Sequence, residues 1–555
     1  MNASSKREPR QVGRLAGLAS AAAWIFAAVL LVGVALLWQA AANFDHAIVN
    51  VLTFLLLILA WGSLVVSLQL SGRPRWMWRS FFLGPVLACA VLFALYRVER
   101  VDGDLSPKFV SRWKAADELP QASVANETLS AELWQPRASD STQFLGPTRN
   151  AIYSEIELDS DWNAHPPKVL WKVPIGDGWS SFAIQGDVAV TMEQRNEQEW
   201  ITCYNVLNGE LLWGYAIDSK HTNPMGGTGP RSTPLLADNR VYACSAVSQL
   251  VCLDIANGQE LWTQDLLKLA GVTQSEFEMR VAWGRSASPL IYKEQIIVPM
   301  GGANACSLIG FDAITGQERW RAGQEEISYA SPSLATIHDR EQLLYITEQH
   351  LRAFDPQSQA ELWSVPWPGS SHGSASVSQP LVFDGNRILM SKGYGEGCQV
   401  IEVELTQEGE NADPDASQTS TKQWSVDVKW KNATSLRTKF TTAVIRDGYA
   451  YGLSDGILEC IALADGERQW KKGRYRQGQV LLVGSHLLIT SESGEIVLVA
   501  ATPERFHELA KLDVIGDVTW NVPALSGNRL LMRNSDEAAC VILPTVELPK
   551  SEPLE

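Results

Sequence analysis

Ten aromatic, cationic and amide side chains recur along the sequence, each near the start of a short apolar segment. They are Trp179, Arg231, Arg285, Tyr329, His372, Lys439, Tyr475, Gln479, Trp520 and Asn521. Cations pair with carboxylates and phosphates, and aromatic faces stack on planar groups. If these side chains converge, they suit an anionic ligand, a planar ligand or an acidic peptide. The alternative is that they satisfy loop carbonyls and neighbouring carboxylates around a water-filled channel, which is the commoner role of crowded polar groups.

No other residue pattern predicts a catalytic centre. The eight His residues form no HExxH motif and no pair at helical metal spacing. There is no GxSxG elbow for a nucleophilic serine and no GxxxxGK[ST] loop for a phosphate. We therefore predict neither a catalytic residue nor a metal site.

A repeated pattern must position these side chains. It starts with a small residue, passes through a tight turn and ends with Trp. Its five copies are CYNVLNGELLW ending at Trp213, CLDIANGQELW at Trp262, GFDAITGQERW at Trp320, AFDPQSQAELW at Trp363 and CIALADGERQW at Trp470. Self-similarity of this kind is typical of a solenoid, a propeller or an array.

Each copy predicts two short strands around a turn. Gly209, Gly258, Gly316 and Gly466 supply the positive φ that such a turn needs. Gln359 takes this place in the fourth copy, so we expect its turn to be built differently. We expect the small first residue to face a Trp of an adjoining unit. Burying one indole is worth about 4–6 kcal/mol as an upper estimate, so these contacts would join unit to unit.

Two further strands precede each hairpin, and Pro often stands early in the first of them, which marks an edge strand. Four antiparallel strands whose first is an edge describe a propeller blade. Five blades carry the repeated hairpin, a sixth ends at Trp430 with its hairpin interrupted, and a seventh has lost its Trp. The last has three strands, and Lys168–Pro174 with Trp171 would complete it. The prediction is an all-β, eight-bladed propeller over 144–545, with seven blades as the alternative.

The first hundred residues are different and predict a membrane anchor. Long uncharged segments predict three transmembrane helices at about 15–42, 47–70 and 77–96. Cations precede the first helix and separate the second from the third: Lys6, Arg7, Arg10, Arg14, Arg73, Arg75 and Arg79. By the positive-inside rule the N-terminus is cytoplasmic and the propeller lies in the periplasm or another extracytoplasmic space.

The remaining segments are polar. We expect residues 101–143 to form an extracytoplasmic linker with a short helix near 111–116, and 546–555 to form a C-terminal tail. Residues 406–422 are predicted to be an acidic insertion, and 266–279 an insertion with helical spacing. The net charge of −16, with no basic stripe to relieve it, argues against nucleic acid as a partner.

At the repeats, the chain resembles the pyrroloquinoline quinone-like (PQQ-like) β-propeller family, whose motif is seen in CLDIANGQELW and GFDAITGQERW. The resemblance covers about Gly146 to Pro544 and is greatest to membrane-anchored or secreted bacterial members, with FLGPTRN at Phe144–Asn150 as a shared opening. The family includes quinoprotein dehydrogenases and non-enzymatic scaffolds. The resemblance therefore implies the fold and not the function.

The dehydrogenases of that family have a vicinal disulfide, a bound calcium and a catalytic Asp. No two Cys are adjacent here, and no residues could be assigned to calcium or catalysis. We expect a non-catalytic binding or scaffold module without a cofactor. The alternatives are a PQQ- and calcium-dependent alcohol or sugar dehydrogenase, and a sensor that signals through the helices. Cys244 and Cys252 lie on adjacent predicted strands, where a disulfide needs favourable geometry.

Overall fold

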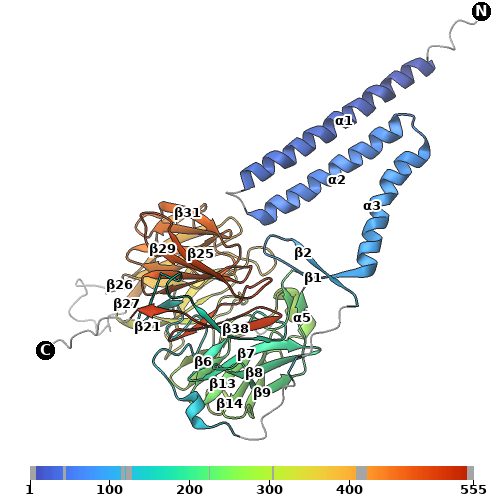
Figure 1. Ribbon diagram of the computed structural model, residues 1–555. Coiled ribbons are helices and arrows are strands. Elements are labelled where there is room, and N and C mark those ends of the chain that lie inside the picture. Colours follow the sequence, from blue (N-terminus) through green and yellow to red (C-terminus); the bar gives the residue numbers. More distant parts are fainter. Residues whose placement is uncertain are drawn as a thin grey trace, which may run out of the picture. The chain divides into compact units, whose positions relative to one another are not determined.

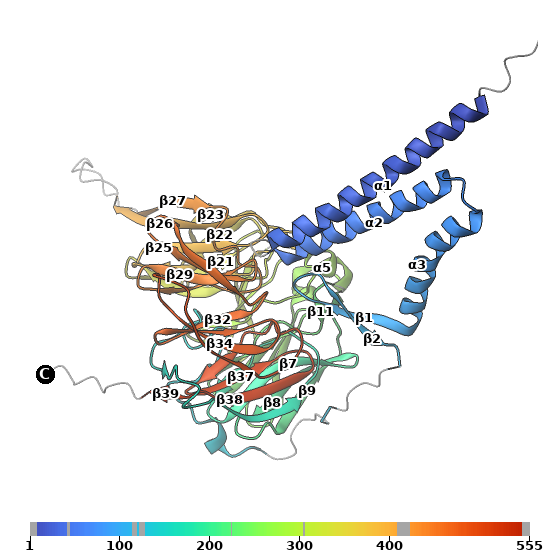
Figure 2. The ribbon, with the colours of Figure 1, turned by 45° about the horizontal axis from the view of Figure 1, so that its top comes forward.

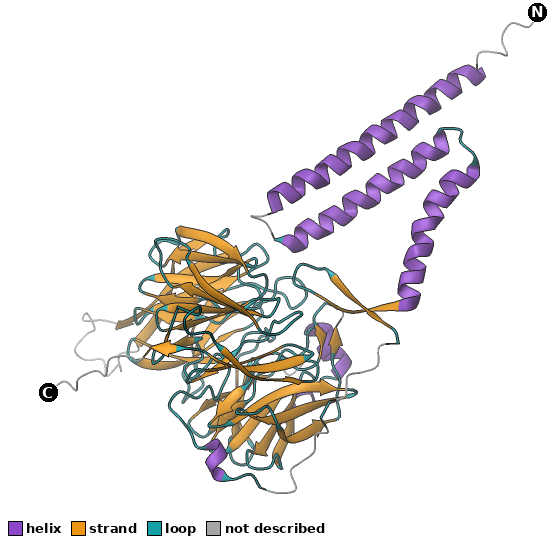
Figure 3. Cartoon of the chain, in the orientation of Figure 1, coloured by secondary structure: helices purple, strands orange, loops and turns teal. Residues whose placement is uncertain are grey.

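The computed structural model describes residues 8–41, 45–113, 119–120, 128–223, 225–302, 306–407 and 422–546. The chain divides into two compact units, Met1–Ala116 and Asp117–Glu555. Figure 1 shows the ribbon coloured along the chain, and Figure 3 separates the helices from the strands. The first unit is mainly helical and the second is mainly strand.

The first unit contains the three predicted helices. They are α1 (Glu8–Ala40), α2 (His46–Leu70) and α3 (Arg75–Leu95). The spans Leu15–Ala40, His46–Leu70 and Arg75–Leu95 are long and apolar enough to cross a membrane. The hydroxyl groups of Ser20 and Ser67 lie 2.8 Å apart and link α1 to α2. The prediction of three long apolar helices is confirmed, although α1 begins at Glu8 and not near residue 15.

Part of the predicted linker is folded. Residues 96–111 form an antiparallel hairpin of β1 (Tyr96–Val101) and β2 (Pro107–Ser111). The Asp102 carboxylate accepts hydrogen bonds from the backbone N–H groups of Asp104 and Ser106 and so holds the turn. The loop runs from 102 to 106 with its positive φ at Leu105, so the signal that the linker prediction overlooked is Asp102, an Asp that bonds the backbone two residues on. The predicted helix near 111–116 begins in β2, and residues 114–116 lie outside the described residues.

Residues 128–143 of the predicted linker lie on the propeller. A 3₁₀ turn, Ala131–Trp134, buries the Trp134 ring in the core of the first blade. The Leu129 N–H donates to the carbonyl of Ala256 at 2.9 Å. The propeller unit therefore begins before residue 144, its predicted start.

Seven of the eight blades are continuous in sequence, and each is a four-stranded antiparallel sheet in chain order. They consist of β6 (Ala183–Gln185), β7 (Val188–Arg195), β8 (Gln198–Asn205) and β9 (Leu211–Ile217); β12 (Leu235–Ala237), β13 (Arg240–Cys244), β14 (Gln249–Asp254) and β15 (Glu260–Asp265); β16 (Leu290–Tyr292), β17 (Gln295–Pro299), β18 (Leu308–Asp312) and β19 (Glu318–Ala322); β20 (Ser333–Ile337), β21 (Arg340–Ile346), β22 (His350–Phe354) and β23 (Glu361–Pro366); β24 (Leu381–Phe383), β25 (Arg387–Lys392), β26 (Gly397–Gln407) and β27 (Lys422–Asn432); β28 (Val444–Arg446), β29 (Tyr449–Ser454), β30 (Ile457–Ala462) and β31 (Arg468–Arg474); and β32 (Gln479–Val483), β33 (His486–Thr490), β34 (Glu495–Ala500) and β35 (Glu508–Asp513).

The eighth blade closes the ring with strands from both ends of the domain. β36 (Ala524–Ser526), β37 (Arg529–Arg533) and β38 (Glu537–Ile542) are completed by β5 (Lys168–Pro174), which pairs with β38. Figure 2 shows β37 and β38 beside β7–β9 of the first blade. The prediction of eight blades is confirmed, and the seven-bladed alternative is wrong.

Several short strands and two short helices lie outside the four-stranded blades. β3 (Ile152–Tyr153) adds a parallel fifth strand to the seventh blade, β4 (Glu157–Leu158) pairs with β39 (Thr545–Val546), and β10 (Thr222–Asn223) pairs with β11 (Gly227–Thr228). The insertion at 266–279 contains α4 (Leu266–Ala270) and α5 (Gln274–Arg280), the latter started by a capping box of Thr273 and Glu276. Most of the acidic insertion, 408–421, lies outside the described residues.

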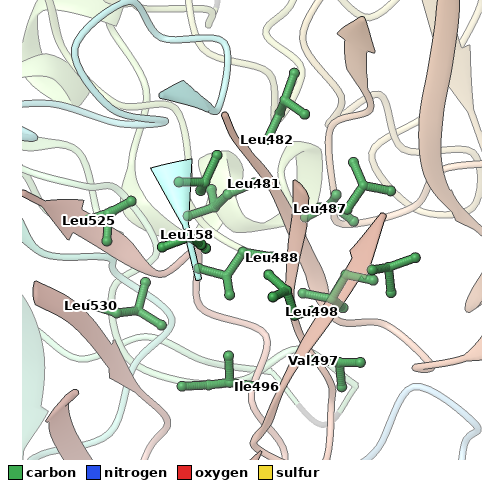
Figure 4. Close-up of a cluster of buried hydrophobic side chains, with 14 of the residues drawn as sticks. Leu158, Leu481, Leu482, Leu487, Leu488, Ile496, Val497, Leu498, Leu525 and Leu530 are labelled. Carbon is green, nitrogen blue, oxygen red and sulfur yellow. The ribbon is translucent and has the colours of Figure 1, made fainter. Parts of the chain in front are cut away.

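The core lies between adjacent blades. Figure 4 shows leucines of the seventh and eighth blades packed together with Leu158, which enters from β4. All eight Cys are free, and seven are buried. The strand register pairs Cys252 with Tyr242 and Cys244 with Leu250. The two Cys considered for a disulfide therefore do not face each other.

Five of the seven repeat Trp residues bridge neighbouring blades. The indole N–H groups of Trp171, Trp213, Trp262, Trp430 and Trp470 donate to the carbonyls of Val206, Ile255, Ala313, Leu463 and Thr502 at 2.8–3.1 Å. The first four rings also lie against the turn glycines of the next blade, Gly209, Gly258, Gly316 and Gly466. A β-carbon at any of these glycines would lie 2.5–2.8 Å from the ring.

The small first residue of the repeat has a different partner from the one predicted. Cys203, Cys252, Gly310, Ala353 and Cys460 are paired across the hairpin with Trp213, Trp262, Trp320, Trp363 and Trp470 of their own units. The prediction that this residue faces a neighbouring unit's Trp is therefore wrong. The turn glycine receives the neighbour's ring instead, because it has no side chain to block it.

Trp320 and Trp363 turn back onto their own blades. The Trp320 indole donates to the Gln295 side chain, and the Trp363 indole to that of Gln342 at 2.8 Å. For Trp320, the turn of the next blade carries Gln359 instead of Gly. Gln359 adopts φ 61°, close to the glycine values, so the expectation of a differently built turn is wrong. The difference is that the side chain of Gln359 stands where the Trp320 indole would otherwise pack.

Candidate ligand pocket at the channel mouth

A pocket of about 140 Å³ lies where the loops entering the first strands of the blades converge. First strands of neighbouring blades contact one another from β36 through β6 and β12 to β16, and from β24 through β28 to β32, so they lie at the centre of the ring. Five predicted ligand residues line this pocket: Trp179, Arg231, Tyr329, Gln479 and Trp520. The structure thus brings together half of the predicted set.

Aromatic rings form a continuous arc around the pocket. Ring centroids are separated by 4.7 Å between Trp179 and Trp520, and by 5.2 Å between Trp520 and Phe440. The arc continues from Phe440 to Trp283 at 6.1 Å and from Trp283 to Tyr329 at 5.1 Å. Five aromatic side chains from different blades therefore present a wall on which a planar or apolar group can stack.

Hydrogen bonds hold the ends of this arc in place. The Trp179 indole donates to the carbonyl of Gly226 at 2.7 Å, and the Trp520 indole to the Glu492 carboxylate at 3.0 Å. The Tyr329 hydroxyl donates to the carbonyl of Ser371 and accepts from the N–H of Trp283. Burial raises the pKa of Tyr329 to about 12, so it remains a neutral donor. These contacts fix the rings before any ligand arrives.

Arg231 is the cation of the pocket. Its guanidinium donates to the carbonyls of Gly226, Gly227 and Gly229, in the loop that contains β10 and β11. Burial lowers its pKa to about 10, which leaves it charged at neutral pH. None of the described residues that line the pocket is Asp or Glu. A positive charge within an aromatic wall favours an anionic or electron-rich planar group.

A buried acid and a buried imidazole lie behind Arg231. Glu199 accepts a hydrogen bond from the N–H of Ala246 at 3.0 Å, and burial raises its pKa to about 7. His221 lies 3.7 Å from the Glu278 carboxylate, and burial together with the charge of Arg231 lowers its pKa to about 4. Among the described residues, Glu199 is the carboxylate whose charge acts on Arg231, and its raised pKa leaves it part-protonated near neutral pH.

The segment 141–153, here called the crossing segment, closes the other side of the pocket. Its backbone accepts hydrogen bonds from Ile184, Leu236 and Leu482, in the first strands of the first, second and seventh blades. The Arg149 guanidinium donates to the carbonyls of Pro289 and Pro332, which precede the third and fourth blades. Burial lowers the pKa of Arg149 to about 9. Phe144 of this segment lines the pocket, which therefore has a floor.

The other predicted residues have structural partners. Arg285 is buried and donates to Ser248 and to the carbonyls of Pro299 and Met300. The Tyr475 hydroxyl donates to Glu508, and Asn521 donates to the carbonyls of Gly178 and Ser180, on either side of Trp179. The Lys439 ammonium lies 6.0 Å from the Tyr394 ring, and His372 is exposed on a loop. Arg285, Tyr475 and Asn521 therefore fit the alternative interpretation, in which these side chains bond to loop carbonyls and neighbouring carboxylates.

Sequence reasoning missed Phe144, Trp283 and Phe440. Trp283 stands two residues before Arg285, and Phe440 directly follows Lys439. The correct loops were identified, but in each the cation turns into the protein and the aromatic neighbour turns to the pocket. An aromatic residue in the same loop position of several blades was the signal available.

The described residues contain no group of three or more His, Cys, Asp or Glu side chains that could hold a metal ion. Calcium in a protein takes six to eight oxygen ligands, usually with several carboxylates. The pocket lining supplies the Gln479 amide and several hydroxyl groups. The Gln479 amide nitrogen donates to the carbonyls of Phe440 and Trp520, so only its one carbonyl oxygen is available, and no described lining residue is a carboxylate. The lining residues therefore do not fit a quinone with its calcium.

Comparisons with known proteins agree on the fold. Residues 197–472 match a family model described as outer membrane protein assembly factor BamB. The quinohemoprotein alcohol dehydrogenase from Comamonas testosteroni is similar over 77% of this chain and 83% of its own, at 12% identity and a TM-score of 0.50. BamB from Moraxella catarrhalis is similar over 70% of this chain and 99% of its own, at 13% identity and a TM-score of 0.44. No curated protein sequence matched. At 12% identity the dehydrogenase structure shows the fold alone, and with the family match it confirms the resemblance to PQQ-like propellers.

Proposed function

We propose that this PQQ-like repeat propeller is a non-catalytic binding and scaffold module, held by its N-terminal helices at the inner membrane. The observation that carries the proposal is the pocket with Phe144 as its floor, which five further aromatic rings line together with Arg231. Its partner is a small ligand or a protein segment with a planar or anionic group. The match to the assembly-factor family supports a protein partner.

The distribution of cations supports the orientation. Lys6, Arg7, Arg10 and Arg14 precede or begin the first apolar span, and Arg73, Arg75 and Arg79 lie between or beside the second and third. Positive charge is retained on the cytoplasmic side of inner-membrane proteins. The N-terminus is then cytoplasmic, and the propeller faces the periplasm or another extracytoplasmic space.

Pocket-dependent capture tests the proposal. The full-length chain and a Phe440→Ala/Trp520→Ala variant are purified from detergent-solubilised membranes, and co-purifying proteins and small molecules are quantified by mass spectrometry. Ile314→Ala is the matched control, because Ile314 is 59% exposed on a blade turn. We expect partners that the control retains and the pocket variant loses. Equal capture by all three proteins would contradict a role for the pocket.

Reconstitution tests the enzyme alternative. Full-length protein is incubated with PQQ and Ca²⁺ and assayed for dye reduction with alcohols and sugars. We expect no turnover above a heat-denatured control. Dye-linked turnover that disappears with the pocket variant would replace the scaffold proposal by a quinoprotein dehydrogenase. Exclusive recovery of cytoplasmic signalling proteins in the capture experiment would instead favour the sensor alternative.

A further inference from the structure

The hairpin of β1 and β2 exposes an apolar face. In its register Val98 is opposite Phe109, and Tyr96 is opposite Ser111. Tyr96, Val98 and Phe109 are 39%, 41% and 37% exposed. A two-stranded hairpin is marginally stable in water on its own. Apolar side chains gathered on one face of such a small element indicate a surface that another phase or partner covers.

This face continues the surface of α3. The helix ends at Leu95 and β1 starts at Tyr96 without a loop. Phe93 of α3 is 50% exposed, and its ring meets that of Phe109 edge-on at 6.1 Å. The Arg112 guanidinium donates to the carbonyl of Phe93 at 2.9 Å and fixes the end of the hairpin on the helix. Helix and hairpin therefore share one apolar surface.

The tip of the hairpin is fixed to the start of α2. The Asn50 amide donates to the carbonyl of Asp104 at 2.7 Å, and the His46 ring lies 3.6 Å from the Asp104 carboxylate. His46 and Asn50 belong to the first turns of α2. The hairpin thus lies level with the helix ends at which α2 begins and α3 finishes. If the helices cross a membrane, this level is its extracytoplasmic boundary.

The side chains at this level are those that membrane interfaces favour. Tyr96 and Trp113 are exposed, the latter to 73%, and Arg97 and Arg112 are exposed cations beside them. Aromatic rings with a polar edge concentrate at headgroup depth, and long cationic side chains reach from there to lipid phosphates. This combination of exposed aromatic rings and cations is typical of a membrane interface and not of a hairpin that faces water.

We propose that the hairpin Tyr96–Ser111 is an interfacial phospholipid-binding element. Tyr96, Val98 and Phe109 lie among the upper acyl chains, and Arg97 and Arg112 contact lipid phosphates. The proposal rests on the membrane anchoring under the proposed function and adds a lipid contact to it. It places the start of the tether to the propeller in the headgroup layer.

Spin-label accessibility in phospholipid nanodiscs tests the proposal on the full-length chain. Cys89→Ser removes the one exposed Cys, and the other seven are buried. Nitroxide labels are placed through Val98→Cys and, to report headgroup depth on the opposite face of the same strand, through Arg97→Cys. Leu57→Cys in α2 reports the bilayer, and Ile314→Cys on the propeller reports water. Power saturation compares access of oxygen, which dissolves in lipid, with that of a nickel chelate, which does not.

We expect the label at 98 to resemble that at 57, with oxygen access at least several-fold above that of the chelate. The label at 97 should lie between the labels at 98 and 314. Chelate access at 98 equal to that at 314, with the label at 57 still in lipid, would overturn the lipid-binding hairpin and leave the anchoring intact. Chelate access at 57 as well would overturn both.

Discussion

Trp262 of the second blade lies on Gly316 of the third. The indole N–H donates to the carbonyl of Ala313 at 3.1 Å, and a β-carbon at Gly316 would lie 2.5 Å from the ring. Gly316 has φ 69°. The glycine therefore meets two independent requirements: a left-handed backbone and space for the neighbouring indole. The same pairing joins Trp171, Trp213 and Trp430 to the blades that follow them.

Replacing Gly316 should weaken the junction between the second and third blades. In Gly316→Ala, the positive φ costs about 1–2 kcal/mol and displacement of the Trp262 ring about 1–3 kcal/mol more. We expect the free energy of unfolding to fall by roughly the sum. Urea titration of the full-length protein in detergent, followed by Trp fluorescence, measures it.

Gly385→Ala separates the two costs. Gly385 has φ 77°, but a β-carbon there would have no heavy atom within 4 Å. We expect this variant to lose only the backbone contribution, about 1–2 kcal/mol. If the two variants are equally destabilised, the indole contact adds nothing and the account of the blade junctions is wrong.

The junction between the third and fourth blades should gain from the reverse change. Gln359 adopts φ 61°, and the preceding Trp320 bonds within its own blade. Gln359→Gly removes the clash between a side chain and a left-handed backbone, which costs about 1 kcal/mol. It also makes room for the Trp320 indole on this turn. We expect a higher urea midpoint. The same substitution at Gln357, an exposed neighbour in that turn, should not raise it, and a rise with both would point to a general effect of turn flexibility.

Much of the propeller could be predicted because its repeat is periodic. The last blade lacks a fourth strand, and Lys168–Pro174 carries the repeat Trp with no strands before it. These two facts were sufficient to predict closure of the ring, and the pairing of β5 with β38 confirms it. The direction of each indole was not predictable in this way. The Trp262 ring could pack on Cys252 of its own blade or on Gly316 of the next blade. Both residues are small, so the sequence does not distinguish the two.

The sequence predicted which loops form the pocket, but in two of these loops it did not predict which residue lines it. Arg285 and Lys439 were chosen for their charge, yet Trp283 and Phe440 line the pocket. Charge is a poor guide where a buried guanidinium such as that of Arg285 can satisfy several loop carbonyls. The hairpin of β1 and β2 was missed for another reason. Its strands carry exposed charged and apolar residues together, a composition that resembles a linker.

Arg149 should be essential to the crossing segment. Its guanidinium donates at 2.9 Å to the carbonyl of Pro289 and at 3.0 Å to that of Pro332, so it ties two blades to residues 141–153. Arg149→Leu leaves these carbonyls without their donor, which costs about 3 kcal/mol. We expect a lower urea midpoint and faster proteolytic cleavage between residues 143 and 151.

The corresponding surface variant is Arg319→Leu, which removes an exposed ion pair with Asp312. Exposed pairs contribute about 0–1 kcal/mol, so this change should be nearly neutral. Arg149→Lys should rescue little, because one ammonium group cannot reach both carbonyls with the geometry of a guanidinium. Full stability of the Lys variant would show that charge alone is required at this position.

Glu199 should make stability depend on pH. Burial raises its pKa in the folded state to about 7, from the ordinary value of 4.5. The folded state therefore binds this proton more tightly than the unfolded state does. Below about pH 4.5 Glu199 is protonated in both states, and its burial does not reduce the free energy of unfolding. As the pH rises from there through about 7, the free energy of unfolding falls by up to about 3 kcal/mol.

Glu199→Gln keeps the acceptor for the Ala246 N–H and removes the titration. We expect the variant to match the wild type near pH 5 and to exceed it in free energy of unfolding by pH 8. His221 is present in both proteins, and Arg231, with a pKa of about 10, stays charged from pH 5 to 8, so the difference between the proteins reports Glu199. Urea titrations at half-unit pH steps measure that difference. A difference that stays constant from pH 5 to 8 would mean that Glu199 is ionised throughout and that Arg231 compensates its burial.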